Sequence, residues 1–277
     1  MKSSKMLKVV SLVSASILSM GILAGCGSSS KKVSTDAVNN SSEVLTDKGS
    51  NQAQSDNVIV MGTNAEFEPF EYRDGLEITG FDVEIAKKIA EKLGKELVIE
   101  DMAFDTLIMA LNSDKVDFIA AGMTATDERK TQVDFSDSYF KSQQMIIVKA
   151  DDTTITTADD LAGKKVGVQL GTTGDLFVST TEEIAEVAQF QAGTQAVMDL
   201  KNGKIDAVVI DAEPAKKMTE GQSDLKLLDA PFIEEEYAIA VKKGNDEILA
   251  AINETLAAIK ADGTYDEIYA KYFDVAQ

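Results

Sequence analysis

One short stretch, directly after a predicted buried strand at residues 118–121, combines side chains that can bind both charges of a small zwitterion. Gly122 ends that strand and lets the backbone approach another group closely. Thr124 carries a hydroxyl that both donates and accepts hydrogen bonds. Arg129 carries a planar guanidinium that matches a carboxylate in a bidentate way. Together these groups are able to hold a carboxylate and an ammonium on one small molecule.

The same stretch is also expected to begin a helix. Thr126 is the expected N-cap, and Asp127 and Glu128 place acidic side chains in the first turn, where the helix dipole favours negative charge. An ordinary strand, loop and helix with an exposed arginine at position 129 has the same pattern. On these residues alone, that simpler interpretation is preferred.

Two further polar segments follow strands in the later half of the chain. Residues 171–174, Gly-Thr-Thr-Gly, follow a predicted strand at residues 165–169 and lead into a helix, so their backbone N–H groups can bind an anion. The loop lacks the Lys-Ser/Thr ending of a phosphate-binding loop, which argues against nucleotide binding. Asp211 follows a predicted strand at residues 206–210. It is interpreted as a helix N-cap, because Pro214 falls in the first turn, and its carboxylate can also bind a cation.

Composition argues against several classes of function. The chain has 277 residues, 44% of them hydrophobic, which is enough for one or two globular domains. Its 47 acidic and 27 basic residues give a formal net charge of -20, which argues against nucleic acid as a partner because phosphate binding needs a positive surface. The chain has no histidine and one cysteine, so we expect no disulfide framework, no metal site and no cofactor.

The N-terminal residues carry the features of an export signal. Residues 1–25 begin with three lysines and continue with a mostly apolar run that is short for a membrane span. The run leads into Leu-Ala-Gly-Cys, which resembles a bacterial lipobox, so Cys26 is the expected site of lipid attachment. A plain signal peptide with an incidental cysteine is the alternative. Residues 26–55 are mostly small and polar and are predicted to form a flexible tether.

From residue 58 onward, predicted strands and helices alternate, which is typical of an α/β fold with parallel strands and helical crossovers. Ligands of such sheets bind outside the carboxyl ends of the strands, where the polar segments described above lie. The expected strands are residues 58–62, 97–99, 118–121, 143–149, 165–169, 187–190, 206–210 and 237–241. The expected helices include residues 82–93, 104–111, 158–163, 196–200 and 248–262.

Several local features of these elements are also predicted. Residues 64–72 are expected to form a loop, because Pro69 cannot donate to a strand ladder. Asp82 is the expected N-cap of the first helix of this part, and Gly94 is expected to end that helix. The aromatic stripe within residues 265–273 is expected to pack into the core.

Seven blocks in one order resemble the bacterial extracellular solute-binding proteins of polar amino-acid ABC importers, over about residues 58–273. The blocks are residues 67–71, 80–85, 104–108, 122–129, 134–136, 171–174 and 262–265. The resemblance implies a type II periplasmic-binding-protein fold, α/β, with two lobes joined by crossing strands near residues 140–143 and 234–237. Lobe 1 would then comprise residues 56–142 and 237–277, and lobe 2 residues 143–236. The α/β pattern restarts after residue 143, which agrees with this division.

The resemblance also implies where the two charged groups of an amino acid bind. Arg129 resembles the arginine that binds the ligand carboxylate. Thr124 and the backbone of Gly122 resemble groups that hold the ammonium and carboxylate atoms. Thr173, together with Thr172, resembles the contact that the second lobe makes with the carboxylate.

The remaining implied contacts surround the ammonium and the ligand side chain. Asp211 resembles the carboxylate that pairs with the ammonium, and Phe67 and Phe104 resemble the aromatic walls. Asn64 and Gln169 depart from many members of the family, which often carry aspartate at the first position and in some cases lysine or another residue at the second. Both positions tend to face the ligand side chain, so the identity of that side chain stays open. Two neutral amides favour a neutral polar amino acid such as glutamine or cystine. A basic amino acid is the alternative, because Glu66 could supply a counter-charge.

The function that we expect is that of a lipid-anchored, extracytoplasmic receptor that delivers a free amino acid to the permease of an ABC importer. We expect it to be a monomer without enzymatic activity that closes its hinge on the ligand. One alternative is an enzyme resembling cyclohexadienyl dehydratase, which uses the same fold and would need a general acid or base in the cleft. Another is a ligand-sensing domain, against which we count the absence of a later membrane span or signalling domain.

Overall fold

The computed structural model describes residues 57–273, which contain two mixed sheets and one small antiparallel sheet. The predicted signal, the tether and Cys26 lie outside the described residues. None of the helices between residues 57 and 273 is long and apolar enough to cross a membrane.

The first sheet is parallel on one side and antiparallel on the other. β1 pairs in parallel with β5 and β6, as the strand–helix alternation predicts, whereas β14 enters antiparallel between β6 and β7. Its strands are, in spatial order, β5 (Glu96–Asp101), β1 (Val58–Thr63), β6 (Phe118–Ile119), β14 (Ala240–Lys242) and β7 (Val133–Phe135).

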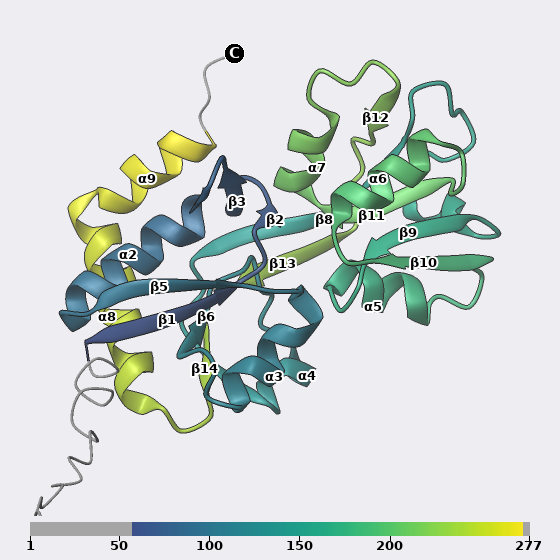
Figure 1. Ribbon diagram of the computed structural model, residues 1–277. Coiled ribbons are helices and arrows are strands. Elements are labelled where there is room, and N and C mark those ends of the chain that lie inside the picture. Colours follow the sequence, from purple (N-terminus) through teal and green to yellow (C-terminus); the bar gives the residue numbers. More distant parts are fainter. Residues whose placement is uncertain (1–56, 274–277) are drawn as a thin grey trace, which may run out of the picture. The chain divides into compact units, whose positions relative to one another are not determined.

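Helices cover both faces of the first sheet. Figure 1 shows α2 and α9 on one side of β1 and β5, with α3 and α4 on the other. The helices are α2 (Phe81–Leu93), η1 (Phe104–Thr106), α3 (Leu107–Asn112), α4 (Asp127–Lys130), α8 (Asp246–Asp262) and α9 (Thr264–Tyr272). Gly94 and Gly263 follow α2 and α8 with φ angles of 67° and 87°, so both helices end at a left-handed glycine, as expected for Gly94.

The second sheet repeats this arrangement. β9 pairs in parallel with β10 and β11, and β8 runs antiparallel to β11, β12 and β13. The strands are β8 (Phe140–Lys149), β9 (Lys165–Gln169), β10 (Glu186–Phe190), β11 (Ala207–Asp211), β12 (Leu225–Leu227) and β13 (Ile233–Tyr237). The helices are η2 (Ala158–Leu161), α5 (Thr173–Thr180), α6 (Gly193–Lys201) and α7 (Ala212–Thr219).

Two strands join the sheets, as the resemblance implies. β8 and β13 pair antiparallel, with Phe140 opposite Tyr237 and Gln143 opposite Glu234. Their ends near the first sheet lie in an aromatic cluster, where the Phe70 ring lies 4.8 Å from that of Phe140 and 5.2 Å from that of Tyr237. The C-terminal aromatic residues join the same cluster, which confirms the prediction that they pack into the core. The molecule therefore has the two-lobed type II fold with two crossing strands.

The segment expected to be a loop at residues 64–72 instead contains two short strands. β2 (Glu66–Phe67) and β3 (Glu71–Asp74) pair antiparallel, and β4 (Glu77–Thr79) completes a three-stranded sheet. The loop prediction was wrong because Pro69 lies between β2 and β3, where its missing N–H removes no ladder hydrogen bond.

The predicted N-cap of α2 was also wrong. Gly80 occupies the cap position with φ of 136°, and a Cβ there would lie 2.1 Å from the Phe70 carbonyl oxygen. Only glycine fits this close approach, and Asp82 falls inside the first turn with its side chain buried.

The strand expected at residues 237–241 is divided in two. β13 ends at Tyr237 and β14 begins at Ala240. The intervening amides bond outside any ladder, Ala238 N–H to the Met123 carbonyl and Ile239 N–H to the Ser136 hydroxyl, because the chain passes here from one sheet to the other.

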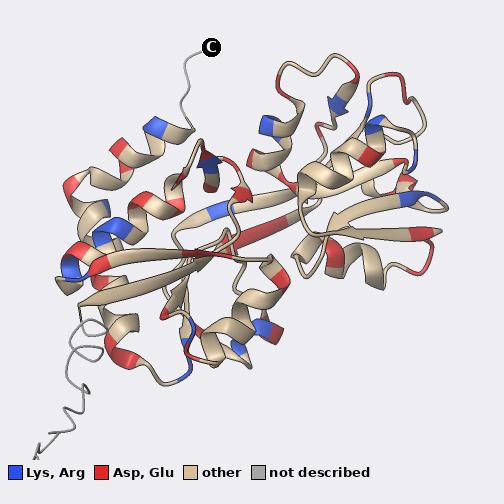
Figure 2. Ribbon diagram, in the orientation of Figure 1, with Lys and Arg blue, Asp and Glu red and all other residues tan. Residues whose placement is uncertain are grey.

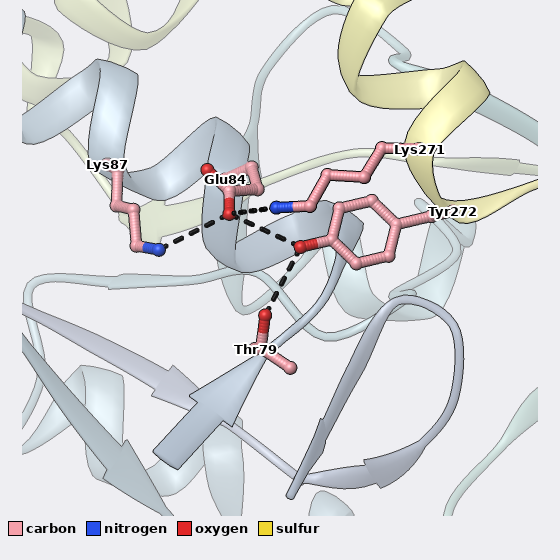
Figure 3. Close-up of polar contacts among 5 residues, drawn as sticks. All are labelled: Thr79, Glu84, Lys87, Lys271 and Tyr272. Atoms are coloured by element: carbon pink, nitrogen blue, oxygen red, sulfur yellow. Dashed lines mark hydrogen bonds and ion pairs between the residues drawn. The ribbon is translucent and has the colours of Figure 1, made fainter. Parts of the chain in front are cut away.

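The last helix is joined to α2 through a polar network around Glu84. Its Oε1 accepts hydrogen bonds from Lys271 Nζ at 3.0 Å, Tyr272 OH at 3.2 Å and Lys87 Nζ at 3.3 Å (Figure 3). The Tyr272 hydroxyl also lies 3.2 Å from Thr79 Oγ1 on β4. Burial alone would raise the pKa of Glu84, but the two lysines bring it below its ordinary value. The network therefore ties α9 to α2 and β4.

Candidate functional site

One pocket lies where strand ends of both sheets approach each other. Its lining comprises Asn64, Phe67, Glu71, Phe104, Ala121, Gly122, Thr124, Arg129, Gln169, Thr172, Thr173 and Asp211. All ten residues that the resemblance implies are in this set, so the structure brings them together around one cavity. Their roles in binding a ligand stay predictions.

The conformation of Gly122 brings the Phe67 ring against the pocket wall. Gly122 has φ of 52°, in the left-handed region that favours glycine. A Cβ at this position would lie 2.7 Å from the nearest atom of the Phe67 ring and 3.4 Å from the Tyr237 ring. The close approach expected of Gly122 is therefore an approach by aromatic side chains.

Arg129 is buried, which rules out the simpler interpretation of an exposed arginine. Only 7% of it is exposed, and Thr126 caps its short helix as expected. Its Nη1 donates to the Thr124 carbonyl at 2.8 Å, and its Nη2 donates to the Gly171 carbonyl at 2.9 Å. Its guanidinium lies 5.3 Å from the centre of the Phe104 ring. Two of the five N–H donors are used here, so three stay available for an anion.

Burial and the neighbouring charges have opposite effects on the pKa of Arg129. Burial lowers its pKa, while the nearby carboxyl groups of Glu235 and Asp211 act in the opposite direction. The guanidinium is charged throughout the physiological range. The pocket therefore contains a fixed cation with little solvent around it.

Asp211 stands at the N-terminus of α7, but its side chain does not cap the helix. Its Oδ1 instead accepts a hydrogen bond from the Tyr237 hydroxyl, which also lies 3.0 Å from Ser142 Oγ. Burial raises the pKa of Asp211 well above its ordinary value, and the neighbouring Glu235 carboxyl raises it further. Asp211 therefore occupies the predicted N-cap position, but its carboxyl group bonds to the Tyr237 hydroxyl from β13 and not to the backbone of the helix.

Glu235 belongs to the site and has no counterpart among the predicted residues. Its Oε2 accepts from Thr124 Oγ1 at 3.1 Å and from Gln144 Nε2 at 3.2 Å. It is the middle member of three consecutive glutamates on β13, of which only Glu235 is buried. Figure 2 shows this acidic strand between the two sheets. Strand alternation was a signal that could have found it, because Glu235 shares one face of the strand with the apolar Ile233 and Tyr237.

The two amides of the pocket bind each other. Gln169 Nε2 donates to Asn64 Oδ1 at 2.8 Å and to the Gln191 carbonyl at 3.2 Å, which uses both of its hydrogens. Asn64 Nδ2 donates to the Met102 carbonyl at 2.9 Å. The Gln169 group that stays available to a ligand is therefore its carbonyl oxygen, which can only accept.

The loop at residues 171–174 leads into α5, as predicted. Thr172 is the N-cap and accepts from the Asp175 amide at 3.2 Å, while its own hydroxyl donates to the Gln169 carbonyl at 2.7 Å. Thr173 Oγ1 accepts from Gln144 Nε2 at 3.3 Å, which leaves its hydroxyl hydrogen available. The N-terminus of α5 faces the pocket and favours negative charge there.

Glu71 and Asp82 place two more carboxyl groups at the pocket. Glu71 lines it, and Asp82 lies behind Gly122 and accepts from the Gly122 amide at 2.9 Å. Both residues are fully buried. Glu66, in contrast, is exposed and lines a separate cleft of about 660 Å³ beside α6 and α7. The cleft beside α6 and α7 is larger, but its charged side chains are in contact with solvent. The buried charged side chains, Arg129, Glu71 and Asp211, line the smaller pocket.

These features define a class of protein: two α/β lobes, two crossing strands, and a buried cation and buried carboxyls facing one small pocket. This is the arrangement of a two-lobed solute-binding protein. Residues 59–275 match the profile of the bacterial extracellular solute-binding proteins, family 3. The chain belongs to this family.

Individual relatives agree with that membership. The chain is 37% identical to the arginine-binding extracellular protein ArtP of Bacillus subtilis, over 78% of this chain and 86% of that protein. A mutant of ArgBP from T. maritima has a TM-score of 0.77 and 42% identity, over 81% of this chain and 98% of that one. An ancestral arginine-binding protein bound to glutamine has a TM-score of 0.75 and 44% identity, over 78% and 98%. The chain is a solute-binding protein of the amino-acid ABC transporter type.

Proposed function

We propose that the pocket binds the zwitterionic end of one free amino acid between Arg129 and Asp211. Arg129 and Thr124 would bind the carboxylate from one lobe, with Thr172, Thr173 and the N-terminus of α5 contributing from the other. The observation that carries this proposal is that Arg129, a guanidinium, and Asp211, a carboxyl group, are both buried and line the same pocket. A desolvated zwitterion needs both partners, because an unpaired buried charge is costly.

The rest of the pocket would hold the ammonium and the ligand side chain. The ammonium would lie between Asp211 and the Gly122 carbonyl. The side chain would pass between Phe67 and Phe104.

We propose that the ligand side chain is cationic, as in arginine. Glu71, Asp211 and Glu235 are buried carboxyl groups at or beside the pocket, and Arg129 is the one buried cation among residues 57–273. The Gln169 carbonyl oxygen adds an acceptor, since both amide hydrogens of Gln169 are already used. An excess of acceptors and negative charge suits a ligand that brings donors and positive charge. Relatives named for arginine support this choice.

A neutral polar amino acid, such as glutamine or cystine, is the second candidate. Asn64 and Gln169, which line the pocket and are hydrogen-bonded to each other, are uncharged amides. The ancestral relative named as bound to glutamine supports this candidate as well.

Calorimetry on the full-length protein separates the two candidates. We expect arginine and lysine to bind at least about a hundredfold more tightly than glutamine and cystine, since a buried charge pair contributes several kcal/mol. Tighter binding of glutamine or cystine would replace the cationic proposal with the neutral one. Failure of all four to bind would contradict the zwitterion proposal itself.

We further propose that ligand contacts from both lobes stabilise the closed state. In this proposal lobe 1 comprises residues 56–142 and 237–277, lobe 2 comprises residues 143–236, and a monomer delivers the ligand to an ABC permease. Small-angle scattering should give a smaller radius of gyration with ligand. An unchanged radius at saturation would contradict closure. The ligand should be recovered chemically unchanged, because the function proposed is binding and not catalysis.

Membrane attachment is proposed through lipid on Cys26, with the protein held outside the cytoplasm. Two or more acyl chains are expected, since one chain anchors only marginally. Cys26→Ala should move the protein from the membrane fraction to the soluble fraction. A mutant that fractionates like the wild type would contradict the anchor.

A further inference from the structure

Asp211 occupies the N-cap position of α7 without capping the helix. Its backbone has extended φ and ψ angles of −63° and 151°, which suit an N-cap, yet its side chain accepts no hydrogen bond from the helix. An aspartate at this position normally accepts from the amide of the second or third helical residue. The Asp211 carboxyl group is therefore kept from a bond that its place in the backbone favours.

The sequence of α7 lacks the amide that N-cap side chains use elsewhere in the molecule. In three other helices the N-cap side chain accepts from the amide of the third helical residue, at 3.2 Å in α4 and α5 and at 3.3 Å in α8. The third residue of α7 is Pro214, and proline has no backbone N–H. α7 therefore offers the Asp211 side chain fewer donors than these helices offer their caps.

A tyrosine on the crossing strand β13 binds the Asp211 carboxyl group instead. The Tyr237 hydroxyl donates to Asp211 Oδ1 and lies 3.0 Å from Ser142 Oγ. The Tyr237 ring is fully buried, stacked on Phe140 at a centroid distance of 5.7 Å and edge-on to Phe70 at 5.2 Å. Packing against these rings fixes the position of the hydroxyl, and the hydroxyl in turn fixes the carboxyl group.

We propose that Tyr237 and Pro214 are positioning residues that keep the Asp211 carboxyl group at the pocket and away from the amides of α7. Asp211 lines the pocket, whereas the other two residues lie outside its lining. Tyr237 supplies the donor that holds the carboxyl group, and Pro214 removes the donor that would compete for it. Only the use of this group for the ligand ammonium rests on the proposed function.

Both residues can be changed without altering the pocket lining. Tyr237→Phe removes one oxygen atom and keeps the aromatic ring that packs in the core. Pro214→Ala gives α7 an amide N–H at its third residue, and because Pro214 is buried, that amide is buried and needs an acceptor. The Asp211 carboxyl group becomes this acceptor only when it has turned away from Tyr237. The effects of the two changes should therefore depend on each other.

The first test needs no ligand and uses urea denaturation of the full-length protein. Pro214→Ala should lower the urea midpoint by more than Pro231→Ala, the matched change at an exposed proline outside any helix or strand, because the new amide has no acceptor. A raised midpoint in Pro214→Ala would overturn the proposal, since Asp211 would then cap α7 despite its bond to Tyr237. This comparison is sufficient even if Tyr237→Phe does not fold.

The second test adds Tyr237→Phe and the double variant to the urea measurements. Tyr237→Phe should lower the midpoint, because it removes a donor from a buried carboxyl group. Adding Pro214→Ala to Tyr237→Phe should raise the midpoint again, since the released carboxyl group accepts from the new amide. The same change would thus destabilise the wild type and stabilise Tyr237→Phe. Equal shifts in the two backgrounds would overturn the proposal.

The third test measures arginine binding by calorimetry. Tyr237→Phe should weaken binding by about tenfold or more, because its Asp211 carboxyl group is no longer held at the pocket. Tyr72→Phe, which removes a hydroxyl that lines the larger cleft, is the control and should bind as the wild type does. Binding by Tyr237→Phe within about threefold of the wild type would overturn the positioning role.

The double variant separates positioning from a purely structural role. It should be more stable than Tyr237→Phe and yet bind arginine more weakly, because the new cap holds the Asp211 carboxyl group away from the pocket. An affinity that recovers together with stability would overturn the positioning role. Absence of arginine binding by the wild type would contradict the proposed ligand, and the urea measurements would then decide the placement of Asp211 by themselves.

Discussion

The side chain of Gln169, at the end of β9, donates a hydrogen bond of 2.8 Å to the side chain of Asn64, which directly follows β1. One amide belongs to the second sheet and the other to the first. The bond therefore joins the lobes through protein atoms alone, next to the pocket in which we propose that the ligand binds.

Removing this amide should loosen the closed state. We expect Gln169→Ala to weaken ligand binding by about 0.5–1.5 kcal/mol, the usual contribution of one hydrogen bond, and mainly through faster release. Stopped-flow measurement of the dissociation rate checks this. Gln195→Ala, an exposed change on α6, is the control. An unchanged dissociation rate in Gln169→Ala would contradict a role in closure.

The charged pair should dominate affinity. Arg129→Ala and Asp211→Ala should each cost about 2–5 kcal/mol of binding free energy, because each leaves a ligand charge buried without its partner. Arg129→Lys should also bind much more weakly, since an ammonium cannot replace the two-pronged guanidinium. Calorimetry measures all three, with exposed Lys130→Ala as the control. Binding by Arg129→Ala within about threefold of wild type would rule out this carboxylate site.

Gly122 should tolerate no side chain. Gly122→Ala combines a left-handed φ of 52° with a Cβ 2.7 Å from the Phe67 ring, so we expect it to destabilise the fold by more than the roughly 1–2 kcal/mol of backbone strain alone. Gly75→Ala isolates the strain, because Gly75 has φ of 63° and no atom within 4 Å of the added Cβ. Urea denaturation measures both, and equal losses in the two variants would argue against the contact.

Two buried carboxyl groups, Glu71 and Asp82, should make stability depend on pH. The folded pKa values of Glu71 and Asp82 are raised, that of Asp82 to about 6. A raised folded pKa stabilises the fold below the unfolded pKa, and this stabilisation is lost as pH rises through the folded value.

The stability advantage of Glu71→Gln over the wild type should consequently grow as pH rises from about 4, by at most about 1.4 kcal/mol per pH unit. Free energies of unfolding from urea titrations at several pH values check this. A difference that stays constant with pH would contradict it.

Most of the regular elements follow from local patterns. The alternation of strands and helices predicted the parallel pairing of β1 with β5 and β6, and Gly94 predicted the end of α2. Motif order predicted which ten residues meet at one pocket. These features depend on residues close in the chain or on spacing shared with the family.

The errors arise where distant segments determine the environment. Asp82 was expected to cap a helix, but Gly122 and Tyr139, each about 40 or more residues away, supply its hydrogen bonds. Glu71 and Glu235 look like surface glutamates in the sequence, and only the pairing of β3 with β2 and of β13 with β8 buries them. Burial of a charged side chain is a property of the assembled sheets.

The insertion of β14 between β6 and β7 has a consequence for how the chain folds. β1, β5 and β6 are synthesised early, but their sheet is completed only by residues 240–242, after the whole second sheet has been made. The second sheet is continuous in the chain and can pair as soon as β13 emerges. The edge of β6 stays open until β14 has been made and pairs with it. An open strand edge is a site of aggregation. Rapid formation of the second lobe therefore shortens the period during which the nascent first lobe is exposed.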